Sequence, residues 1–275
     1  MRIDSHQHFW KYDADRDQWI TEDMAVLRRD FMPEDLVPLL ERNSIEGCIA
    51  VQTDQSEGET EFLLDLASRF SAIRGVVGWV NLRSPNVHKS LKKYSECRKF
   101  RGVRHIVQSE PDDRFMVRED FVNGIAALQD HGLTYDILVY PHQLPAAIEL
   151  VSRFPSQPFV LDHIAKPSIR TGKQNGWIGQ LRELSQSKDV YCKVSGLVTE
   201  ADWQSWTASD IFPYLDVVFE AFGCDRVMFG SDWPVCLLAG TYDRVLSLVR
   251  DYTSGFSHAD QDAFFGLNAA RFYGV

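Results

Sequence analysis

Eight short apolar segments recur along the chain, and a stretch with helical spacing of apolar residues follows each of them. The segments are rich in Val, Ile, Leu and aromatic residues, as strands buried on both faces of a parallel sheet are. Alternation of strand and helix predicts parallel βαβ units. The expected strands cover residues 3–9, 47–53, 76–82, 100–107, 134–140, 159–164, 190–197 and 227–232.

The number of these units favours a closed sheet over an open one. Eight strand–helix units within 275 residues match a (β/α)8 barrel, which needs about 250 residues as one domain. Residues 33–43 begin with Pro and acidic residues, as a first helical turn prefers, and residues 260–274 are expected to form the final helix. The sequence therefore predicts an α/β fold, a single-domain TIM barrel over residues 1–275, with polar loops at 112–118 and 168–175 over its mouth.

Charge and cysteine content narrow the classes of partner. The net charge of -10 argues against nucleic acid and against an anionic membrane surface, and no apolar run is long enough to span a membrane. The N-terminus lacks the pattern of a secretion signal, and five cysteines without a CxxC pair are typical of free thiols in a reducing compartment. We expect a cytoplasmic protein that acts on a small molecule, and the sequence leaves homo-oligomerisation open.

The first expected strand ends in a pair of histidines, His6 and His8. Side chains alternate along a strand, so both imidazoles point the same way and can hold one divalent ion. An HxH pair alone is a weak signal. Its position is what favours a metal site, because TIM barrels build their active sites at the C-terminal ends of the strands.

Two further strand ends carry residues suited to catalysis. Asp232 ends the eighth segment, and in a closed barrel the eighth strand pairs with the first. We therefore expect Asp232 to reach His6 and His8, to share the metal ion and to accept a proton from attacking water. His163 follows the sixth segment and is expected to be a third ligand or to polarise a substrate carbonyl. A buried structural histidine is the alternative for His163.

The fourth segment contains neighbouring basic residues of which only one can face the barrel interior. We expect Val103 and Val107 to face the helices, so that Arg104 points inward and contacts the substrate. The opposite assignment would place His105 inside.

Other candidate substrate contacts follow the strand ends. Tyr140 and Lys166 come after the fifth and sixth segments, and Trp10 and Trp79 could stack on sugar C–H groups. Lys166 could equally be solvated, the tryptophans could equally be packing residues, and His142 beyond Tyr140 fits a surface loop.

Several segments together resemble one family. They are IDSHQHFW, GWVNL, GVRHIVQSEPD, LVYPHQLPAAIELVSRFP, FVLDHIAKP, YCKVSGL, FGSDWPV and NAARFYG, and they run from His6 to Tyr273. The chain resembles the amidohydrolase-related family, and its nearest branch is similar to L-fuconolactone and L-rhamnonolactone hydrolases. The resemblance implies a hydrolase that opens a small sugar lactone. It also implies that Asp232 is the general base, that His163 polarises the carbonyl or handles the proton of the leaving group, and that Arg104 contacts substrate oxygens.

Two departures from the family pattern concern the metal. No lysine ends the fourth segment, since Lys99 precedes it, so a two-metal site is not expected. The fifth segment ends in Leu-Val-Tyr140, where relatives with one metal often place a histidine. The resemblance therefore implies one divalent ion, Zn²⁺, which some related lactonases dispense with.

Two other functions remain open at this stage. The same superfamily includes decarboxylases of aromatic or muconate-like acids, but such a substrate calls for more than one arginine at the mouth. A non-catalytic sugar-binding protein is the second alternative.

Overall fold

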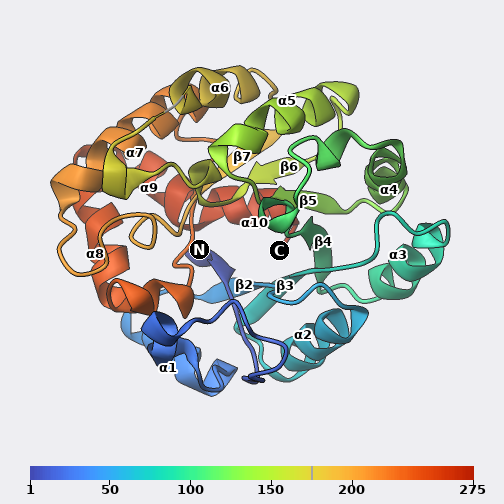
Figure 1. Ribbon diagram of the computed structural model, residues 1–275. Coiled ribbons are helices and arrows are strands. Elements are labelled where there is room, and N and C mark those ends of the chain that lie inside the picture. Colours follow the sequence, from blue (N-terminus) through green and yellow to red (C-terminus); the bar gives the residue numbers. More distant parts are fainter. Residues whose placement is uncertain (175) are drawn as a thin grey trace.

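The computed structural model describes residues 1–174 and 176–275, and its eight strands form one parallel sheet in sequential order (Figure 1). The strands are β1 Ile3–Gln7, β2 Gly47–Val51, β3 Ile73–Gly78, β4 Phe100–His105, β5 Thr134–Ile137, β6 Phe159–Leu161, β7 Val190–Val194 and β8 Val227–Phe229. The helices around them are α1 Pro33–Arg42, α2 Glu57–Arg69, α3 Val87–Ser95, α4 Glu119–Asp130, α5 Leu144–Arg153, α6 Trp177–Leu184, α7 Ala208–Phe222 and α8 Tyr242–Tyr252. The predicted (β/α)8 barrel is confirmed.

The predicted strands are all present, but each ends earlier than the sequence pattern suggested. β6 stops at Leu161 rather than at residue 164, and β8 stops at Phe229 rather than at residue 232. The reason is local: His163 and Asp232 have positive φ angles of 52° and 56°, which no strand residue adopts. Apolar periodicity cannot reveal such a turn.

The C-terminal segment covers one end of the barrel. The expected final helix is divided into α9 His258–Asp262, a π-helical turn at Ala263–Leu267 and α10 Asn268–Tyr273. Phe272 and Tyr273 pack with residues that point into the barrel, among them Ile49, Val77 and Met228. The π-helical turn lies against the backbone at the start of β1. This segment therefore covers the end where strands begin and leaves the opposite end for a site.

The polar segments expected over the mouth contain short helical turns. One turn spans Phe115–Val117 and the other Ile169–Thr171. Asn175, at the end of the second predicted loop, lies outside the described residues. Among the helices of residues 1–174 and 176–275, none is long and apolar enough to cross a membrane.

Two glycines in outer helices test how tightly the helices pack. A Cβ on Gly124 in α4 would lie 2.2 Å from the backbone oxygen of Leu82, so Gly124→Ala should lower the free energy of unfolding by about 1–3 kcal/mol. Gly179 in α6 has no neighbouring heavy atom within 4 Å of such a Cβ. Gly179→Ala should therefore raise the free energy of unfolding by about 0.5–1 kcal/mol through helix propensity. Urea denaturation measures both changes, and shifts of the same sign would contradict the packing argument.

Candidate active site

The ends of β1 and β8 are joined by backbone hydrogen bonds. The amide of His8 donates to the Trp233 carbonyl at 2.7 Å, and the amide of Asp232 donates to the His6 carbonyl at 2.8 Å. Asp232 Oδ1 consequently lies 3.3 Å from His8 Nε2 and 3.9 Å from His6 Nε2. The sequence prediction that barrel closure brings this carboxylate to the histidine pair agrees with these distances.

A left-handed turn places the next two side chains. Residues 163–166 all have φ angles between 50° and 62°, and the amide of Lys166 donates to the carbonyl of His163 at 2.8 Å. Left-handed backbone costs about 1–2 kcal/mol for each residue with a Cβ. The turn is held from outside, because the indole of Trp177 donates to the carbonyl of Ile164 at 2.7 Å. His163 and Lys166, at its two ends, both line the cavity above the barrel.

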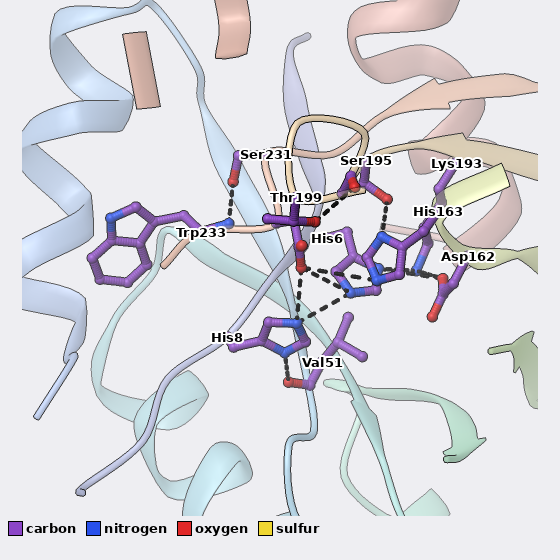
Figure 2. Close-up of polar contacts among 12 residues, drawn as sticks. His6, His8, Val51, Asp162, His163, Lys193, Ser195, Thr199, Ser231 and Trp233 are labelled. Carbon is purple, nitrogen blue, oxygen red and sulfur yellow. Dashed lines mark hydrogen bonds and ion pairs between the residues drawn. The ribbon is translucent and has the colours of Figure 1, made fainter. Parts of the chain in front are cut away.

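Hydrogen bonds behind the imidazoles orient them (Figure 2). His8 Nδ1 is 2.7 Å from the carbonyl oxygen of Val51, so Nδ1 carries the proton and Nε2 presents a lone pair. His163 Nδ1 is 2.9 Å from Ser195 Oγ. Gly196 lies beside that ring at φ 63°, where a Cβ would come within 2.6 Å of His163 Nδ1. A glycine is therefore required there by both conformation and space.

The donor atoms of three residues converge as metal ligands do. The Nε2 atoms of His6 and His8 are 3.2 Å apart, and Asp232 Oδ1 is 3.3 Å from His8 Nε2. Lone pairs and a carboxylate at such distances repel one another unless a cation or a proton lies among them. Two ligands on a tetrahedral ion with bonds of about 2.0–2.1 Å lie about 3.4 Å apart. The set His6, His8 and Asp232 thus fits a single divalent ion.

A second group, His6, Asp162 and His163, is also close enough to share an ion. Asp162 is already engaged, however: its Oδ2 lies 3.0 Å from Arg104 Nη1 and its Oδ1 lies 3.0 Å from Lys193 Nζ. In the first group, among the described residues, only His6 Nε2 has a cationic neighbour, Arg104 Nη1 at 3.3 Å, whereas both oxygens of Asp162 are engaged in the second. The first group is therefore the better candidate for a metal site.

Beneath the histidines lies a buried network of charges that the sequence reasoning missed. Lys193 from β7 pairs with Asp136 and with Asp162, and Arg104 pairs with Asp162. Two cations and two carboxylates balance one another without solvent. His6 Nδ1 touches this network, 3.2 Å from Lys193 Nζ and 3.3 Å from Asp162 Oδ1. A signal was present in the sequence, because Lys193 is a charged residue inside an apolar segment, and a buried charge requires a partner.

Burial sets the protonation of the site. It lowers the pKa of His6 well below its ordinary value, and it lowers the pKa of His163 to about 4. Both imidazoles are therefore neutral at neutral pH. Burial alone would raise the pKa of Asp232. As the pH falls, however, the neighbouring imidazoles, that of His163 foremost, take up protons before this carboxylate does, and their positive charge holds the pKa of Asp232 well below its usual range. Asp232 is thus an ionised carboxylate.

A cavity of about 360 Å³ opens above these groups. Predicted residues that line it are His8, Arg104, Tyr140, His163, Lys166 and Asp232. Arg104 points inward, as alternation along β4 predicted. His105 faces the other way, with Nε2 2.7 Å from Glu110 Oε1 and its ring stacked on Phe115.

The two tryptophans predicted to touch substrate lie elsewhere. Trp10 is buried, and its indole donates to the carbonyl of Arg29 at 3.0 Å because β1 ends at Gln7 and the chain turns outward. The indole of Trp79 lies 3.3 Å from His105 Nδ1, on the helix side of the strands. Neither lines the cavity among the described residues, whereas Trp19 and Trp203 do. Both of these sit in irregular loops, where periodicity carries no signal.

His142, which the sequence left open, is exposed beyond the cavity. Its ring stacks on Tyr140, and its Nε2 lies 3.4 Å from Asp113 Oδ1.

A (β/α)8 barrel with histidines and a carboxylate at its C-terminal mouth is the architecture of a metal-type barrel enzyme. The amidohydrolase family model matches residues 3–275, and the chain belongs to this family. A curated L-fucono-1,5-lactonase from Burkholderia multivorans is 44% identical over 100% of this chain and 96% of its own length. One from Burkholderia ambifaria is 37% identical with the same coverage. These comparisons confirm the predicted family and its hydrolase class.

A solved structure extends the likeness to the backbone. An amidohydrolase from Burkholderia multivorans with bound Zn has a TM-score of 0.95 and 43% identity, covering 100% of this chain and 99% of that one.

The lowered pKa of His163 predicts a specific pH dependence of stability. Between the unfolded value of 6.5 and the folded value of about 4, the unfolded chain binds a proton that the folded chain does not. Lowering the pH through this window should therefore reduce the free energy of unfolding, by about 3 kcal/mol from this residue. His163→Gln should lose correspondingly less. Urea denaturation of both proteins at pH 7 and near pH 4.5, with chelator, measures the difference, and equal pH slopes would refute the assignment.

Proposed function

We propose that this protein hydrolyses a neutral sugar lactone to the corresponding aldonic acid, with L-fucono-1,5-lactone as the first substrate to test. The observation that carries the proposal is the ionised carboxylate of Asp232 among three oriented imidazoles at the base of a cavity. The 44% identity to an L-fucono-1,5-lactonase supports the choice of substrate. L-rhamnonolactone is the alternative substrate, and its hydrolysis would be the same type of reaction.

Asp232 is the general base in this proposal. Its carboxylate takes a proton from water, and the water oxygen attacks the lactone carbonyl carbon. His163 faces the same point, with Nε2 3.9 Å from Asp232 Oδ1. When the Ser195 hydroxyl donates to Nδ1, His163 keeps its proton on Nε2 and donates a hydrogen bond from Nε2 to the carbonyl oxygen, which stabilises the oxyanion without transferring the proton. The tetrahedral intermediate then collapses, the ring C–O bond breaks, and the leaving oxygen takes the proton from Asp232.

We propose Zn²⁺ as the ion that His6, His8 and Asp232 would hold. When bound, such an ion supplies Lewis-acid polarisation of the carbonyl and makes water more acidic. The carbonyl of Val51 keeps the His8 lone pair directed at the site. Asp162, against His6 Nδ1, does the same for His6 when that nitrogen carries the proton.

The upper cavity would hold the sugar. Arg104, Tyr140 and Lys166 offer donors to its oxygens, and Trp19 and Trp203 offer flat apolar faces to its C–H groups.

All five cysteines are free thiols, which supports the further proposal of a reducing, cytoplasmic location.

Asp232→Asn should abolish turnover while preserving the fold. Loss of a general base costs on the order of 10²–10⁴ in rate, and the isosteric amide keeps the side-chain volume. A pH-drop assay with L-fucono-1,5-lactone measures the rate, and thermal unfolding checks the fold. Asp130→Asn at the end of α4 removes the same charge from an exposed position and should leave the rate unchanged. Retained activity in Asp232→Asn would exclude this residue as the base.

Zinc binding can be tested without an activity assay. Adding Zn²⁺ to chelator-treated protein should raise the midpoint of thermal unfolding, because a ligand that binds only the folded state stabilises it. His8→Gln removes one proposed ligand and should abolish most of that rise. An identical rise in the variant would place the ion elsewhere.

A further inference from the structure

Each cationic side chain that lines the cavity is paired with a carboxylate, as far as the described residues show. These cations are Arg104 and Lys166, and the carboxylates that line the cavity are Glu200 and Asp232. Arg104 Nη1 lies 3.0 Å from the buried carboxylate of Asp162, and its Nη2 donates to the carbonyl of Gln52. Lys166 Nζ lies 3.5 Å from Glu200 Oε1. An acidic substrate would therefore meet no cation that lacks a carboxylate partner.

The Lys166–Glu200 pair sits in the cavity wall. Lys166 ends the left-handed turn after β6, with Nζ 5.8 Å from the centre of the Tyr140 ring, and Glu200 follows β7. The two side chains are 18% and 21% exposed, so both heads remain accessible from the cavity. At 3.5 Å the pair is longer than a good charged hydrogen bond. Each head therefore retains hydrogen-bonding capacity for a ligand.

We propose that Lys166 and Glu200 together determine the substrate class, by binding neighbouring hydroxyls of a neutral lactone and rejecting lactones that carry a carboxylate. The inference rests on the proposed function and deepens it. An ammonium group only donates hydrogen bonds and an ionised carboxylate only accepts them. Two adjacent sugar hydroxyls can satisfy both, one as acceptor and one as donor. A ligand carboxylate could only compete with Glu200 for Lys166 and would be repelled by Glu200.

If the Lys166–Glu200 pair had only a structural role, the expected results would differ. A partly exposed ion pair contributes about 0–1 kcal/mol to stability. If the pair only joined the β6 turn to the β7 loop, its removal would change stability slightly and would not alter which lactones bind. Discrimination between neutral and anionic lactones is thus the readout that separates the two roles.

The test measures how strongly two added lactones compete with L-fucono-1,5-lactone, as apparent inhibition constants. L-Galactono-1,4-lactone is neutral, and galactaro-1,4-lactone carries a carboxylate in place of the terminal CH₂OH. Glu200→Gln leaves Lys166 without its counter-charge, so the ratio of anionic to neutral inhibition constants should fall by about tenfold, which is the effect of one modest charge interaction. The KM for the neutral substrate should rise while kcat changes less, because the carboxylate acceptor is lost.

Three further variants serve as controls for the effect of Glu200→Gln. Lys166→Gln should shift the ratio the opposite way, since Glu200 is then unopposed, and it serves if Glu200→Gln fails to fold. The double variant Lys166→Gln/Glu200→Gln should lose the gain in anion binding. Glu183→Gln on α6 removes one exposed negative charge that does not line the cavity, and it should leave the ratio unchanged.

The outcomes separate the two proposals. If the wild-type protein does not hydrolyse the lactone, the proposed function is wrong. If it does, but the inhibition ratio is the same in wild type, Glu200→Gln and Lys166→Gln, the function stands and the specificity inference is overturned.

Discussion

The backbone hydrogen bonds between the ends of β1 and β8 are the interaction on which the site depends. In an open sheet of eight strands spaced about 4.8 Å apart, the first and last strands would lie more than 30 Å from each other. Closure instead brings Asp232 Oδ1 within 3.3 Å of His8 Nε2. Side chains support the join, since Asp4 Oδ1 accepts from the Ser231 amide at 2.8 Å and Ser5 Oγ donates to the Phe229 carbonyl at 2.6 Å.

The barrel interior changes character along its axis. Where the strands begin, it is apolar and covered by the aromatic side chains of α10. Nearer the site it holds the paired charges of Lys193, Arg104, Asp136 and Asp162, and Tyr273 connects the two regions by donating to Asp136 at 2.8 Å. Removing one member of a buried pair typically costs about 3–5 kcal/mol. The network therefore makes the geometry around His6 hard to change.

Strained backbone is concentrated where the functional side chains leave the sheet. Asp232 and the four residues 163–166 all adopt the left-handed region, and glycine occupies it at position 196 beside His163. Regular strands would have directed these side chains alternately to the two faces of the sheet. The left-handed turns instead direct these side chains toward the cavity at the barrel mouth, and the surrounding packing and hydrogen bonds hold them there.

The sequence by itself determined the fold class and the meeting of His6, His8 and Asp232. Eight repeated strand–helix units indicate a closed parallel barrel. In a closed barrel the eighth strand lies beside the first, whatever their separation in the sequence. Side-chain alternation also decided between Arg104 and His105, because it depends only on the neighbouring residues.

Only the tertiary structure decided which tryptophans line the cavity, how Lys193 and Asp162 are paired, and that Lys166 meets Glu200. The physical reason is the range of the interactions. Periodicity reports contacts within a strand or a helix. The irregular loops that carry Trp19, Trp203 and Glu200, and the turn that ends in Lys166, take their positions from packing against segments distant in the chain.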